Sequence, residues 1–99
     1  MPSSTARIAT ADGSRLITRL CTHWAHKLEV EFDQTSARVV FDADTTTDLA
    51  ATADALEARV TAPDAAKLAQ FQGVVASHLE RMARGETLEI SWRLDGDRS

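Results

Sequence analysis

The sequence contains one cysteine, no apolar run long enough to cross a membrane, and no excess of basic residues. The single Cys21 excludes an internal disulfide framework. A membrane helix requires about 18 or more consecutive apolar residues, and the polar residues 1–5 lead into no apolar run of the kind that forms a signal peptide. These absences predict a cytoplasmic protein that does not use a membrane as a partner.

Basic residues are also too few for nucleic acid binding. The chain carries 11 Lys and Arg residues against 15 Asp and Glu residues, which gives a formal net charge of −4. Proteins that bind a phosphate backbone gain affinity mainly from Lys and Arg side chains that displace counterions. We therefore expect no nucleic acid partner. The sequence also contains no complete catalytic motif, internal repeat or low-complexity segment.

The length of 99 residues fits a single domain. The fractions of hydrophobic residues (43%) and charged residues (26%) are close to globular averages, which argues against disorder except at the chain ends. We expect a flexible tail over residues 1–5, a single α+β domain over residues 6–94, and a second tail over residues 95–99.

Apolar residues at helical spacing predict two helices. The first spans about residues 13–26 and follows a capping segment at residues 12–14. The second is expected to begin at Pro63 and Asp64, to run to about residue 84, and to end at Gly85. The apolar stripes are Leu16, Ile17, Leu20, Cys21 and Trp24 in the first helix, and Leu68, Phe71, Val75, Leu79 and Met82 in the second.

Alternation of apolar and polar residues predicts the strands. They are expected at about residues 7–10, 28–33, 37–41, 45–51, 56–61 and 87–93. The links between the four middle strands are too short for parallel crossovers, so the sheet should be mainly antiparallel. The predicted fold is α+β in the order (β)αββββαβ, with five or six strands, both helices packed on one face, and a charged opposite face in solvent.

Several local strings resemble a known bacterial family. Residues 20–27 read LCTHWAHK and run directly into the alternating LEVEF of residues 28–32. The second helix opens with APD at residues 62–64 and continues as QGVV at 72–75 and HLER at 78–81, and the last strand closes on Trp92. Over about residues 6–93, the chain is similar to the family known as domain of unknown function 2218.

The resemblance implies the fold described above and no established activity. It also implies a context, because members of the family are associated with siderophore-interacting flavoproteins and iron-uptake genes. The chain departs from the family pattern locally, at Met82 and in the loop at residues 42–44, which lacks a glycine. These departures do not change the expected fold.

Three histidines and Cys21 form the candidate metal site. His23 and His26 lie three residues apart near the end of the first helix, and Cys21 precedes them. His78 lies at the edge of the apolar stripe of the second helix. If the C-terminal halves of the helices meet over the sheet, a histidine-rich set forms that suits zinc, iron or copper. The alternative is that the histidines make ordinary hydrogen bonds on amphipathic helices and that Cys21 belongs to the core.

These observations assign no catalytic residue and no cofactor. We expect a non-enzymatic accessory or binding domain that takes a small ligand, a metal or a protein partner, with iron or siderophore handling as the implied context. Two alternatives stay open. One is an enzyme that uses the histidines as acid, base or metal centre. The other is a structural homodimer that associates through the outer sheet face or an edge strand.

Overall fold

The computed structural model describes residues 2–83 and 87–95, which form one sheet with two helices. The elements in chain order are β1 (Ser3–Ala9), α1 (Gly13–Trp24), β2 (Glu29–Phe32), β3 (Ser36–Asp42), β4 (Thr45–Ala51), β5 (Ala55–Thr61), α2 (Ala65–Met82) and β6 (Trp92–Leu94). The α+β class and the element order predicted from the sequence are confirmed.

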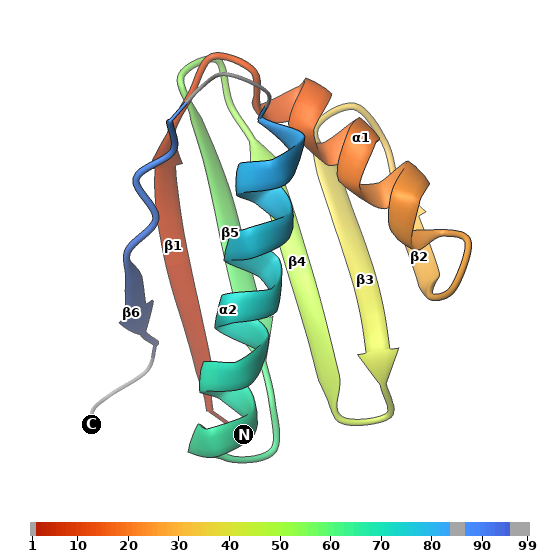
Figure 1. Ribbon diagram of the computed structural model, residues 1–99, viewed down its shortest axis with the longest axis vertical. Helices are drawn as coiled ribbons and strands as arrows, with labels where there is room; N and C mark the ends of the chain where they lie inside the picture. The colour runs from red at the N-terminus through yellow and green to blue at the C-terminus, as the bar shows by residue number, and fades with distance from the viewer. Residues whose placement is uncertain (1, 84–86, 96–99) are drawn as a thin grey trace.

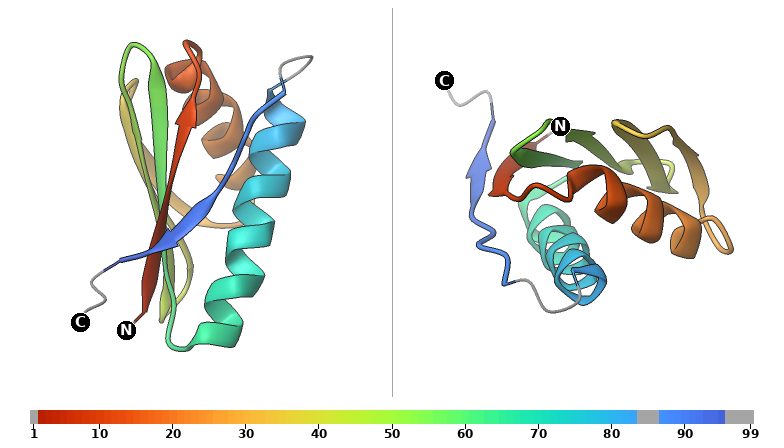
Figure 2. Two further views of the ribbon diagram at one scale, coloured as in Figure 1. Left: turned by 90° about the vertical axis from the view of Figure 1, so that its left-hand side faces the viewer. Right: turned by 90° about the horizontal axis from the view of Figure 1, so that it is seen from above.

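The six strands form one sheet in the order β2-β3-β4-β5-β1-β6. Every neighbouring pair is antiparallel, and β1 lies between β5 and β6 (Figure 1). Both helices cover the same face of the sheet (Figure 2), as predicted. The strands β2 and β6 are therefore the two edges, and no helix of residues 2–83 and 87–95 lies on the opposite face.

The core lies between the sheet and the two helices. Alternate residues of the strands point toward the helices, which explains the period-two pattern in the sequence. Five such residues, each at most 2% exposed, are Ile8, Val39, Leu49, Leu56 and Val60. The helix α1 contributes its apolar stripe to the same cluster. It begins very close to the sheet, because a Cβ at Gly13 would lie 2.9 Å from the Ala51 Cβ.

The helix boundaries differ slightly from the predicted ones. The helix α1 ends at Trp24, and the N–H of Ala25 still donates to the Cys21 carbonyl at 2.8 Å. Asp64 is the N-cap of α2, since its side chain accepts a hydrogen bond from the Lys67 N–H at 2.8 Å. Pro63 therefore precedes the cap instead of opening the helix. The predicted helix end at Gly85 lies outside the described residues.

The predicted N-terminal tail is wrong for residues 3–5, which belong to β1. Ser4 is fully buried, and β1 is hydrogen-bonded to a strand on each side. The sequence pattern places the start of this strand at Arg7, because the small and polar residues before it show no alternation of large apolar side chains. Pairing with both β5 and β6 supplies the stabilisation that such side chains lack.

The last strand is shorter than predicted. Residues 87–91 are irregular, although Leu88 is buried, and the chain joins β1 only at Trp92. Asp95, expected in the C-terminal tail, is held at the sheet because the Thr5 hydroxyl donates to its Oδ2 at 2.7 Å and Arg59 Nε lies 3.3 Å from that oxygen. Burial of Leu88 against the core satisfies its apolar character without strand pairing.

Within residues 2–83 and 87–95, neither helix combines the length and the apolar character that a membrane crossing requires.

Candidate functional site

The C-terminal part of α1 meets α2 at two histidines. The ring centroids of His23 and His78 lie 5.9 Å apart, with the ring planes tilted by 41°. His78 Nδ1 lies 2.7 Å from the Val74 carbonyl oxygen. A carbonyl oxygen only accepts hydrogen bonds, so Nδ1 carries the hydrogen and donates it. This bond fixes the orientation of the His78 ring.

Neither Cys21 nor His26 joins this pair. Cys21 is fully buried in the core, and burial raises the pKa of its thiol to about 11. His26 is exposed in the turn that follows α1. In the part of the chain that the structure describes, no three His, Cys, Asp or Glu side chains are placed to hold a metal ion. Two imidazoles are one ligand fewer than the three protein ligands typical of catalytic zinc sites.

His78 also packs in a row of aromatic side chains. Its ring centroid lies 5.1 Å from that of Trp24, which makes an edge-to-face contact with Phe41 at 5.2 Å and 82°. Phe41 continues the row to Phe71 at 4.7 Å. Trp24 is only 6% exposed, so it anchors α1 to β3 and α2. This arrangement gives His78 a packing role whatever else it does.

A hollow of about 400 Å³ lies on the solvent side of α1, beside the end of α2. It is lined by Thr18, Arg19, Thr22, His23, His26 and Met82. All but Met82 come from α1 and its C-terminal turn, at spacings that place them on one helix face. Arg19 Nη1 donates to the Met82 carbonyl oxygen at 2.9 Å, which ties the two helices together and fixes the guanidinium at the hollow.

The charge around this hollow is opposite to that of the whole chain. Residues 13–27 include Arg15, Arg19 and Lys27 and no carboxylate, whereas the chain has a net charge of −4. A guanidinium has five N–H donors, and the bond to Met82 uses only one. The two imidazoles and the Thr22 hydroxyl add further donors, whereas the Thr18 hydroxyl donates to the Ser14 carbonyl at 3.1 Å. The lining can therefore donate hydrogen bonds to an anionic group, but among the described residues it contains no activated nucleophile.

Sequence reasoning selected His23 and His26 but missed the rest of this lining. Thr18, Arg19 and Thr22 read as the ordinary polar face of an amphipathic helix. The signal that would have found them is the absence of Asp and Glu over residues 13–27 of an acidic chain. Met82 could not be assigned, because its contact with Arg19 joins residues 63 positions apart.

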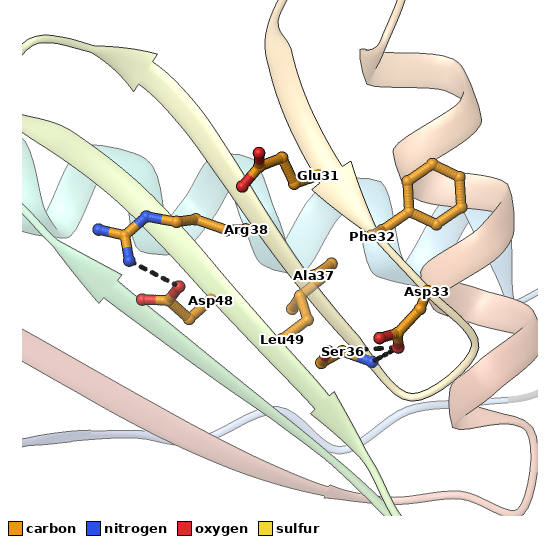
Figure 3. A pocket seen from close by; sticks show the side chains of 8 residues that line it. All are labelled: Glu31, Phe32, Asp33, Ser36, Ala37, Arg38, Asp48 and Leu49. Carbon is orange, nitrogen blue, oxygen red and sulfur yellow. Dashed lines mark hydrogen bonds and ion pairs between the residues drawn. The ribbon is translucent and has the colours of Figure 1, made fainter.

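A second hollow, of about 500 Å³, lies at the β2 end of the sheet (Figure 3). Most of its charged groups already have partners. Arg38 Nη1 lies 3.7 Å from Asp48 Oδ1, and Asp33 Oδ1 accepts backbone N–H bonds from Thr35 and Ser36 at 2.8 and 2.9 Å. These bonds, the Thr35 bond first, lower the pKa of Asp33. Among the described residues that line this hollow, Glu31 is the charged group without an ion-pair or hydrogen-bond partner for its side chain.

A third hollow, of about 370 Å³, lies at the β6 end of the sheet and is lined by Thr5, Arg7, Ser91, Arg93 and Asp95. Most of its charges are also paired within the sheet. Arg7 Nη1 lies 3.5 Å from Glu57 Oε2, and Asp95 is bonded to Thr5 and Arg59. Among the described residues, Arg93 has no ion-pair partner. This hollow therefore has fewer groups free to bind a ligand than the hollow beside α1.

Comparison with known proteins gives a family and a fold. A family model described as "Uncharacterized protein conserved in bacteria (DUF2218)" matches residues 5–93. The chain is 41% identical to PA4090 from Pseudomonas aeruginosa, whose NMR structure superposes with a TM-score of 0.80. The match covers 94% of this chain and 96% of PA4090. A comparison with curated proteins gives no match. Neither match carries a name that specifies an activity, metal or ligand.

Proposed function

The chain belongs to the uncharacterised bacterial family of domain of unknown function 2218, and on that premise we propose that it is a binding domain for a small anionic ligand, held in the hollow beside α1. The observation that carries this proposal is the lining itself. Arg19, His23 and His26 meet there with two threonines, and among the described residues no carboxylate lines the hollow. Donors of this kind pair best with carboxylate or phosphate oxygens.

The size and surroundings of the hollow narrow the ligand class. A volume of about 400 Å³ is within the range of small-molecule sites, and Met82 adds an apolar side to it. Both α1 and α2 end nearby, and the partial negative charge of these helix ends opposes an anion. Arg19 offsets this at α2 by binding the Met82 carbonyl. A compact carboxylate or phosphate anion that pairs with Arg19 therefore fits the hollow best.

A titration followed by ¹⁵N–¹H correlation spectra tests the proposal. Citrate and inorganic phosphate are added separately at constant ionic strength, with chloride as the reference anion. We expect saturable shifts of backbone amides over residues 18–26 and near Met82. Shifts spread evenly over the chain, or shifts that never saturate, would contradict a defined site.

Matched variants separate the hollow from general charge attraction. Arg19→Gln and the double change of His23 and His26 to Gln should each weaken binding by about tenfold or more, since each removes donors to a charged ligand. Arg15→Gln removes the same charge from an exposed position on α1 outside the lining, and should change affinity by less than about twofold. If Arg15→Gln and Arg19→Gln weaken ligand binding equally, the affinity depends on net charge and not on the hollow.

The iron or siderophore context is a special case of this proposal. Ferric chelates of carboxylate ligands are anionic, so ferric citrate is added to the same titration. Paramagnetic broadening confined to amides around the hollow would support this context. Binding of iron-free citrate without such broadening would remove the iron context and leave the anion site in place.

A further inference from the structure

The two edges of the sheet carry matching exposed features. Among the described residues, the large apolar side chains that are exposed are Phe32 (43%) and Leu94 (56%). Phe32 lies on β2 and Leu94 on β6, at opposite edges of the sheet (Figure 1). Both alternate with a charged residue that points to the outer face, Glu31 on β2 and Arg93 on β6. Figure 3 shows Phe32 and Glu31 pointing to different sides of β2.

Strand direction allows the two edges to pair. The six strands alternate in direction across the sheet, so β2 and β6 run in opposite directions. Suppose that a second copy is shifted within the plane of the sheet, across the strands, with its helices on the same face. Its β6 would then lie beside β2 of the first molecule and run antiparallel to it. No inversion of the molecule is required, and the outer faces of the two sheets stay on one side.

The backbone of β2 has free groups at the required positions. The Asp33 N–H donates to the Ser36 carbonyl at 2.9 Å, so this is a hydrogen-bonded pair of the β2–β3 ladder. Such pairs alternate along an antiparallel ladder, so Glu31 also directs its backbone toward β3. Val30 and Phe32 consequently direct their N–H and C=O groups to the open edge.

The same reasoning applies to β6. The Asp95 N–H donates to the Ser3 carbonyl at 2.9 Å, so Arg93, two residues earlier, directs its backbone toward β1. Trp92 and Leu94 direct their backbone groups to the open edge. In both edge strands, the residues with free backbone groups are the apolar ones, and the central charged residue has none.

We propose that β2 of one molecule pairs with β6 of a second copy of this chain, so that the sheet continues from molecule to molecule. In this register the free backbone groups of both edges face each other. Glu31 and Arg93 form a pair without backbone hydrogen bonds, in which side chains approach most closely. The paired residues are Val30 with Leu94, Glu31 with Arg93, and Phe32 with Trp92.

Charge selects this pairing over the other edge contacts. Pairing of β2 with β2 would bring Glu29 and Glu31 against the same residues of the second copy, and pairing of β6 with β6 would oppose Arg93 to itself. In the proposed contact, Glu29 lies opposite Asp95, whose carboxylate is already bonded to Thr5 and Arg59. The contact is head-to-tail, so it builds open chains of molecules and no closed dimer.

The contact is small, because four residues of β2 meet three of β6. Interfaces of small area are weak, so association should be visible from about 20 μM to about 1 mM. Sedimentation velocity over this range should show a weight-average mass that rises past twice the 10.8 kDa of one chain. A mass that stays at one chain, or that stops at two, overturns the proposal.

Charge reversal tests the Glu31–Arg93 pair. Glu31→Arg and Arg93→Glu each create a like-charge pair and should keep the chain monomeric over the same range. The double variant restores an opposite pair in swapped order and should associate again. Glu80→Arg makes the same charge change on an exposed position of α2 and should associate as the wild type does. Single reversals that associate as the wild type does would refute the pair.

Proline variants test the head-to-tail geometry. Phe32→Pro removes an N–H that faces the open edge of β2, and Leu94→Pro does the same for β6, so neither breaks a bond within the sheet. Each variant alone should be monomeric. In an equal mixture, the Leu94→Pro chain keeps an intact β2 and the Phe32→Pro chain keeps an intact β6. These two edges can pair once, so the mixture should form a dimer of the two variants and nothing larger. A mixture that stays monomeric, or that exceeds two chains, contradicts the assignment of the edges.

Discussion

A buried hydroxyl in the core allows a quantitative test of the packing. Thr47 is fully buried in the centre of β4, and its Oγ1 atom has no hydrogen-bond partner among the described residues. Its cross-strand neighbours are Val39 and Val60, both also fully buried. A buried hydroxyl without a partner costs about 1–3 kcal/mol in proteins. Thr47→Val replaces this hydroxyl by a methyl group of similar size.

We expect Thr47→Val to raise the free energy of unfolding by about 1–2 kcal/mol, because the desolvation cost disappears and the valine fits the same space. For a domain of this size, each kcal/mol corresponds to a rise of about 4–8 °C in Tm. Urea unfolding followed by far-UV circular dichroism and by tryptophan fluorescence measures the change. The m-value should stay constant, since the surface exposed on unfolding is unchanged.

Thr46→Val is the matched control for this measurement. Thr46 is the neighbouring residue of β4, half-buried on the outer face, and its substitution should change stability by less than about 0.5 kcal/mol. If Thr47→Val lowers stability or leaves it unchanged while Thr46→Val is neutral, the Thr47 hydroxyl has a partner in solution, such as an internal water. The reasoning from an unsatisfied hydroxyl would then be refuted.

Three further predictions concern the buried thiol, a pair of helix glycines and one carboxylate. Cys21 is fully buried with a thiol pKa of about 11, so it should resist iodoacetamide at pH 8 in the native protein and react fully in urea; rapid native labelling, read by mass spectrometry, would contradict its place in the core. Gly13→Ala should destabilise the fold by about 1–3 kcal/mol in urea unfolding, because the added Cβ would lie 2.9 Å from the Ala51 Cβ. A Cβ added at Gly73, in the middle of α2, would have no atom within 4 Å, so Gly73→Ala should stabilise the fold by about 1 kcal/mol. If Gly13→Ala were instead the more stable of the two variants, the helix positions would be wrong. The folded-state pKa of Asp33 lies below the ordinary 3.8, so its contribution to stability is present above that pH and is lost as the pH falls through the lowered folded-state value. Asp33→Ala should therefore be less stable than the wild type at pH 7 and equal to it at strongly acid pH, and a difference that persists in acid would exclude the carboxylate as its cause.

The sequence predicted the central part of the fold well because each element there has one apolar face. The stripe of α1 and the alternation in β3 and β5 reflect burial on the helix side of the sheet, and a periodic burial pattern is the strongest signal a single sequence offers. The middle strands were also joined by short polar turns, which left antiparallel pairing as the only option.

The ends of the chain were predicted less well for a physical reason. At Ser3 to Thr5, strand formation depends on hydrogen bonds to both neighbouring strands, β5 and β6. Small polar side chains give no sequence signal of this pairing. At residues 87–91 the error is the reverse, since Leu88 alternates with polar residues but is buried without strand pairing. Alternation of apolar and polar residues indicates burial, and a residue such as Leu88 can be buried without pairing in a sheet.

The segment at residues 20–27 shows why the candidate site was only half predictable. Cys21 and Trp24 face the core, and their spacing of three identifies them as part of the helix stripe. His23 lies on the other side, where it contacts His78 and also lines the hollow that contains Arg19. The sequence grouped the cysteine with the histidines because they are adjacent along the chain. The helix separates them by face, so the chemistry available to a ligand is that of Arg19, His23 and His26, and the thiol belongs to the core that holds α1 in place.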